Sequence, residues 1–75
     1  MGLFGNKAPL ETTVGKIMDK IPTGFFLVID CENGVRKKFE LGFGAMAEFD
    51  TLLVGDKVKF THKAGGSVIK TIERA

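Results

Sequence analysis

The sequence predicts an all-β protein, a single small five-stranded barrel with one short helix between its third and fourth strands. A hairpin signal, Asn33-Gly34, follows the apolar run 25–29, whose aromatic and β-branched residues favour a strand. Further segments show strand-like patterns, and only the stretch 45–49 favours a helix. With 75 residues, 44% apolar and 27% charged, the chain has the composition of one globular domain with a small core.

The predicted hairpin spans Thr23 to Leu41, and its turn has two interpretations. A two-residue turn at Asn33-Gly34 pairs Glu32 with Val35. A three-residue loop over 32–34 pairs Cys31 with Val35 instead, and it requires Gly34 to adopt the left-handed conformation. A difference of one residue sends every side chain of a strand to the opposite face, so the choice determines the core.

We favour the three-residue loop, because it places Leu27 opposite Phe39 and Asp30 opposite Arg36, an apolar pair on one face and an ion pair on the other. The residues then expected to face the core are Phe25, Leu27, Ile29, Cys31, Val35, Phe39 and Leu41. The residues expected to face outward are Phe26, Val28, Asp30, Arg36, Lys38 and Glu40.

The remaining strands follow from alternation. A first strand is predicted over 11–21, where Gly15 interrupts the pattern and indicates a bulge or a sharp bend. The segment 57–63 alternates apolar and basic residues and is predicted to be the fourth strand. In the last strand, Val68 and Ile72 are expected to face the core.

This order of strands and helix resembles the oligonucleotide/oligosaccharide-binding (OB) fold, a five-stranded Greek-key barrel with a helix between strands three and four. The segment 53–58 is similar to the turn that opens the fourth strand in many such barrels. The resemblance extends over roughly residues 11–74, in layout rather than in residues. We therefore predict an OB-like domain over 11–75, preceded by a flexible N-terminal arm, residues 1–10. In cold-shock domains the nucleic-acid-binding aromatic residues lie on strands two and three, whereas Gly42-Phe43-Gly44 follows the third strand here, so no functional residue is transferred.

Catalytic chemistry is not predicted. His62 is the only histidine, and we expect it to be a rim residue with a local hydrogen bond. Cys31 is the only cysteine, and we expect it to be a small buried apolar residue. No pair of cysteines or histidines has the spacing of metal ligands. The protein is therefore expected to be neither an enzyme nor a metal or cofactor binder.

Basic residues and one aromatic residue on the outward faces predict a binding surface. Its members are Phe26, Arg36, Lys38, Lys57 and Lys59. Stacking of a base on an aromatic side chain contributes about 1–3 kcal/mol, and neighbouring cations bind phosphates. We therefore predict binding of single-stranded DNA or RNA with low sequence specificity. The alternatives are a protein-interaction or homo-oligomerisation domain that uses the same face and the N-terminal arm, or a solvated strand face without a ligand.

The setting is predicted to be cytoplasmic, because a single cysteine cannot form an internal disulfide. The chain shows no apolar run of about 18 residues and no signal-peptide pattern at Met1, so no membrane association is expected. The net charge of +2 permits a polyanionic partner without requiring one.

Overall fold

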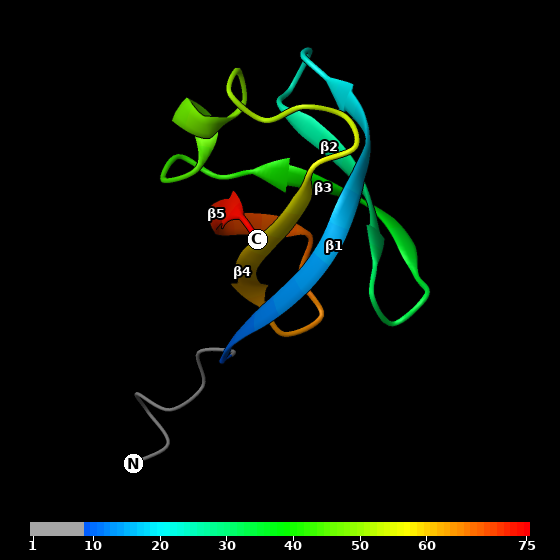
Figure 1. Ribbon diagram of the computed structural model, residues 1–75. Coiled ribbons are helices and arrows are strands. Elements are labelled where there is room, and N and C mark those ends of the chain that lie inside the picture. Colours follow the sequence, from blue (N-terminus) through cyan, green and yellow to red (C-terminus); the bar gives the residue numbers. More distant parts are fainter. Residues whose placement is uncertain (1–8) are drawn as a thin grey trace.

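The computed structural model describes residues 9–75, which form a closed barrel of five β-strands (Figure 1). The strands are β1 (Leu10–Ile21), β2 (Phe26–Cys31), β3 (Arg36–Leu41), β4 (Lys57–Lys63) and β5 (Val68–Arg74). They follow the order β1-β2-β3-β5-β4 around the barrel, and β4 pairs with β1 to close it. The predicted five-stranded barrel is confirmed. The predicted arm, residues 1–10, lies outside the described residues except for Pro9 and Leu10.

The β2–β3 hairpin has the predicted register. Leu27 pairs with Phe39 and Asp30 with Arg36. The three-residue loop is closed by a hydrogen bond of 2.8 Å from the Cys31 amide to a carbonyl oxygen beyond the loop, and Gly34 has a φ of 91°. A side chain would strain this left-handed backbone, so glycine is the residue that permits the loop.

Two residues expected in the core are instead exposed. Phe25 keeps its predicted backbone partner, because its carbonyl oxygen accepts a hydrogen bond of 2.9 Å from the Leu41 amide. Its φ of 56° turns the side chain out of the strand, where its ring meets that of Phe49 edge to face at 5.4 Å. Val35 lies in the loop before β3 and is 50% exposed. Both residues stand at strand ends, where the alternation of faces no longer holds.

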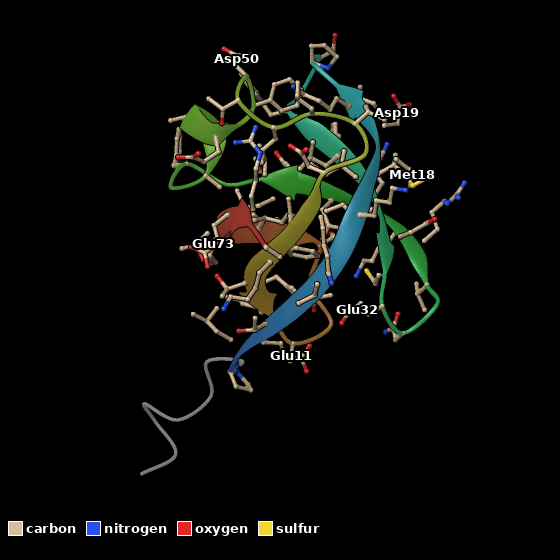
Figure 2. All side chains as sticks on the ribbon, viewed as in Figure 1. Glu11, Met18, Asp19, Glu32, Asp50 and Glu73 are labelled. Atoms are coloured by element: carbon tan, nitrogen blue, oxygen red, sulfur yellow. The ribbon has the colours of Figure 1, made fainter. Side chains whose placement is uncertain are left out.

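Strand β1 is long enough to pair with both β2 and β4. Its bulge lies at Met18: the neighbours Ile17 and Asp19 each pair with a residue of β2, whereas Met18 has no partner there. The bulge is therefore not at Gly15, where the sequence indicated a bulge or a bend. Figure 2 shows Met18 and Asp19 on the outside of β1. Gly15 is instead a site of close approach: an added Cβ would lie 2.5 Å from a side-chain carbon of Ile29.

Strand β5 closes the sheet through a short parallel pairing with β3 and an antiparallel pairing with β4. A bulge at Lys70 changes the phase of β5, so Ile69 and Ile72 face the core while Val68 is 42% exposed. The prediction that Ile72 faces the core is confirmed, and that for Val68 is wrong. Strict alternation could not show the extra residue.

The predicted helix over 45–49 is a single 3-10 turn, η1 (Met46–Glu48). Ala45 and Phe49 on either side of it are buried, so this segment covers one end of the barrel. Within residues 9–75, no helix has the length and apolar character required to cross a membrane. One apolar core fills the barrel. Its members are Ile17, Leu27, Ile29, Cys31, Phe39, Leu41, Ala45, Phe49, Leu52, Val58, Phe60, Ile69 and Ile72.

Candidate functional site

The aromatic and cationic residues predicted on the β2–β3 hairpin lie on its outer face, as expected. Phe26 is half-buried, and the Lys38 ammonium lies 4.6 Å from the centre of its ring. The Arg36 guanidinium donates hydrogen bonds to both carboxylate oxygens of Asp30, at 2.5 and 3.0 Å. This hydrogen bonding lowers the pKa of the Asp30 carboxyl from its usual value. Arg36 is thus already engaged by a carboxylate, and Lys38 covers the aromatic face that would have to receive a base.

The two predicted lysines of β4 are also paired. The Lys57 ammonium lies 3.6 Å from a carboxylate oxygen of Glu32, and the Lys59 ammonium lies 3.9 Å from one of Glu73. All four side chains are exposed, so each pair contributes little to stability. These acids nonetheless neutralise the positive surface that the pattern of lysines indicated.

A different feature lies at the end of the barrel where the β2–β3 loop and the β4–β5 turn meet. A pocket of about 200 Å³ opens there. We call it the end pocket. It is lined by Glu11, Thr13, Cys31, Asn33, Val35, Lys37, Phe39, His62 and Gly65. Figure 2 marks Glu11 at this end of the molecule. Every strand except β5 contributes a residue, so the pocket depends on closure of the barrel.

Among residues 9–75, His62 is the only polar residue that is buried, with 6% of its surface exposed. Its Nδ1 lies 2.9 Å from the backbone carbonyl oxygen of Lys63, and its Nε2 lies 2.7 Å from Oγ1 of Thr13. A carbonyl oxygen can only accept, so Nδ1 carries the proton of the neutral ring and donates it. Nε2 therefore holds the lone pair, and the Thr13 hydroxyl donates to it. The prediction of a locally hydrogen-bonded histidine is confirmed in this sense.

Cys31 and Lys37 are two further polar residues of the end pocket. Cys31 is a free, buried cysteine with 8% exposure, as predicted. Burial raises the pKa of its thiol, and the nearby Lys37 ammonium offsets part of that rise. Lys37 lies on the inward-facing phase of β3 together with Phe39, and its ammonium donates a hydrogen bond of 3.1 Å to the Gly66 carbonyl oxygen.

The end pocket thus brings together the only cysteine and the only histidine of the chain. Thiolate and imidazole are ligands for soft metal ions. Among residues 9–75, no group of three or more cysteine, histidine or acidic side chains is arranged to hold a metal ion. The donor set therefore does not fit a tetrahedral zinc site. It offers two donors of the kind that soft ions prefer, one thiol and one imidazole.

The sequence did not reveal this pocket, although it held two signals. One is Lys37, which falls at an inward-facing position of a core strand. Burial of a charge there costs free energy unless the charge is paired or hydrogen-bonded. The other is that Cys31 and His62 both stand at strand ends on the inward faces. Their proximity itself arises from closure of the sheet, which no local pattern shows.

No protein-family model matches the chain, and the comparison with curated proteins found no match. The fold is similar to solved structures of CusF from Escherichia coli. Apo-CusF has a TM-score of 0.76 and 16% identity, over 95% of this chain and 93% of that one. CusF with Ag(I) has a TM-score of 0.72 and 12% identity, over 93% and 96%. A CusF variant with Cu(II) has a TM-score of 0.69 and 14% identity, over 88% and 91%. At these identities the likeness establishes the fold.

The prediction of nucleic-acid binding is wrong. The solved structures with this fold include CusF with Ag(I) and a CusF variant with Cu(II). Three of the four cations expected to bind phosphates are paired with carboxylates. The alternative of a protein-interaction or homo-oligomerisation domain is not supported either. The predicted partners, a single-stranded nucleic acid, a protein or a second copy, are withdrawn with these functions.

The predicted cytoplasmic location is withdrawn as well. The solved structures to which the fold is similar are those of CusF, and they give no support to that location. That prediction depended on the single cysteine. One buried thiol cannot form an internal disulfide in any compartment, so it does not distinguish a reducing setting from an oxidising one.

Proposed function

We propose that this protein binds a soft monovalent metal ion, Cu(I) or Ag(I), as cargo, with Sγ of Cys31 and Nε2 of His62 as its ligands. The observation that carries the proposal is that Cys31 and His62, 31 positions apart in the sequence, both line the end pocket. The likeness in fold to CusF, solved with Ag(I) and in a variant with Cu(II), supports the same class of ligand.

The hydrogen bonds of His62 favour this role. Metal-binding histidines commonly donate their second ring N–H to a carbonyl oxygen or a carboxylate, which fixes the tautomer and the ring orientation. Here the backbone carbonyl of Lys63 accepts from Nδ1, which leaves the lone pair of Nε2 as the one that a metal ion could bind. The Thr13 hydroxyl, which now donates to Nε2, would have to rotate away to admit an ion.

The thiol of Cys31 makes binding depend on proton release. Burial raises its pKa, so at neutral pH the thiol is protonated, and the metal must displace that proton to form a thiolate bond. A thiolate and an imidazole together carry one negative charge, which balances one monovalent ion. Cu(I) and Ag(I) accept two ligands and prefer soft donors.

We propose further that the barrel is OB-like and that the protein is a binding module rather than an enzyme. The β1-β2-β3-β5-β4 order and the 3-10 turn between β3 and β4 support the first statement. Ion carriage needs reversible ligation and no chemical step on a substrate, which agrees with a pocket whose donors are one thiol and one imidazole.

Titration of the reduced protein with Ag(I), followed by native mass spectrometry and by amide and imidazole NMR shifts, tests the proposal. We expect one ion per chain, with the largest shifts at Cys31 and His62. Cys31→Ser and His62→Phe should each weaken binding at least tenfold. Met46→Leu removes a soft sulfur outside the end pocket and should bind as the wild type does. Undiminished binding by Cys31→Ser would refute the assignment.

A further inference from the structure

Lys37 is the unusual residue of the end pocket. It stands in the inward-facing phase of β3, opposite Ile29, and its neighbour Phe39 on the same face is buried. Its ammonium is held in place by the Gly66 carbonyl oxygen at 3.1 Å and lies 5.2 Å from the centre of the Phe39 ring. A lysine that served only solubility would project from the outer face, as Lys38 does.

The position of this ammonium gives the end pocket a fixed positive charge. Lys37 is near enough to the Cys31 thiol to influence it, and it lines the same pocket as His62. The carboxylate that also lines the pocket belongs to Glu11, an exposed residue. Two charges in a partly buried pocket interact more strongly than two charges in water, because the effective dielectric constant is lower. The Lys37 ammonium therefore repels a second positive charge on any bound ion.

We infer that Lys37 is a specificity-determining residue that makes the end pocket select monovalent over divalent metal ions. This inference rests on the proposed function, because it concerns the same two ligands. A monovalent ion bound to the Cys31 thiolate forms a neutral unit beside the ammonium. A divalent ion leaves one further positive charge there. The pocket holds no second thiolate, and its one carboxylate belongs to Glu11, an exposed residue whose charge is screened by solvent. The preferred cargo is therefore Ag(I) or Cu(I), and the excluded class comprises ions such as Zn(II).

The experiment compares affinities for Ag(I) and Zn(II) in the wild type and in three variants. Lys37→Gln removes the charge and keeps a polar side chain, and we expect the Ag(I)-to-Zn(II) affinity ratio to fall at least tenfold, mainly through stronger Zn(II) binding. Lys37→Arg retains the charge and should restore the wild-type ratio. Lys38→Gln removes the same charge from the outer face of the same strand and should leave the ratio unchanged within twofold.

The outcomes separate the two proposals. Failure of the wild type to bind Ag(I) would overturn the proposed function, and the selectivity with it. Normal Ag(I) binding together with an unchanged ratio in Lys37→Gln would overturn the role of Lys37 alone. An equal fall of the ratio in Lys37→Gln and Lys38→Gln would show that net charge, rather than the inward ammonium, sets the preference, and would also overturn it.

Discussion

The hydroxyl of Thr13 on β1 lies 2.7 Å from Nε2 of His62 on β4, across the junction that closes the barrel and 49 residues away in the chain. This hydrogen bond satisfies the lone pair that a metal ion would need. Thr13 therefore stabilises the metal-free barrel, and under the proposed function it would compete with the ion for the same nitrogen atom.

Thr13→Val should separate these two effects. The variant keeps the shape of the side chain and leaves the buried Nε2 without a donor, so the free energy of unfolding should fall by about 1–3 kcal/mol. Affinity for Ag(I) should rise up to about tenfold, because a hydrogen bond with a net contribution of about 0.5–1.5 kcal/mol no longer has to be broken. Urea unfolding and silver titration measure both effects. Thr13→Ser keeps the hydroxyl and is the control, and weaker silver binding by Thr13→Val would show that Thr13 supports the ion instead.

Phe39→Ala should destabilise the barrel most strongly among single core truncations on β3. The Phe39 side chain is 2% exposed and meets the rings of both Phe60, at 4.9 Å, and His62, at 5.6 Å. Loss of a buried phenylalanine costs about 3–5 kcal/mol, a large part of the stability of a domain of this size. Thermal and urea unfolding measure it, with Phe43→Ala as the control because that ring is 95% exposed. Equal stability of the two variants would contradict the core assignment.

Gly15→Ala should show that this position requires a close approach of two strands. The added carbon would lie 2.5 Å from Cγ2 of Ile29 and 2.6 Å from the backbone oxygen of Asp30, and the latter cannot move without disturbing β2. We expect a loss of at least about 2 kcal/mol in the free energy of unfolding, within the upper range for overpacking. Gly34→Asn is the comparison. There an added Cβ has no neighbouring atom within 4 Å, and asparagine tolerates a positive φ. The free energy of unfolding should therefore fall much less in Gly34→Asn than in Gly15→Ala.

The hairpin register was predictable because two independent constraints agreed on it. Asn33-Gly34 allowed only a few loops, and the Asp30–Arg36 pair selected among them. Strand β5 offered no such agreement. Val68, Ile69 and Ile72 fit more than one pattern, and only pairing with β4 shows that a bulge makes Ile69 the inward residue. Local alternation thus predicts a strand well and its phase poorly when a bulge intervenes.

The candidate site was missed for a related physical reason. Cys31 and His62 were each interpreted alone, and each has an ordinary local explanation as a buried or rim residue. Their placement around one pocket depends on β1 lying between β2 and β4 and on closure of the sheet, which are long-range contacts. Lys37 could have been noticed, because the confirmed register places it on the inward face of β3, two residues before Phe39.

The segment before β4 should make stability depend on pH through Asp56. The backbone amide of Leu53 donates to Oδ2 of Asp56 at 2.9 Å, and Nε of Arg74 donates to the same oxygen at 3.0 Å. These two hydrogen bonds, the amide first, lower the pKa of the Asp56 carboxyl in the folded protein. The unfolded chain therefore binds the proton more readily.

The stabilisation from Asp56 is fully present above the pKa of the unfolded carboxyl, about 3.9, and is lost as the pH falls through the lower pKa of the folded state. Asp56→Asn removes the part of the stability that depends on ionisation of this carboxyl. The free energy of unfolding of the variant should therefore be lower than that of the wild type at pH 7, and the difference should narrow as the pH approaches 3. Urea unfolding at several pH values measures the effect. Asp50→Asn, at an exposed carboxylate between η1 and β4, is the control and should follow the wild type. A constant difference between Asp56→Asn and the wild type from pH 7 to pH 3 would mean that the hydrogen bonds from Leu53 and Arg74 do not favour the ionised carboxylate.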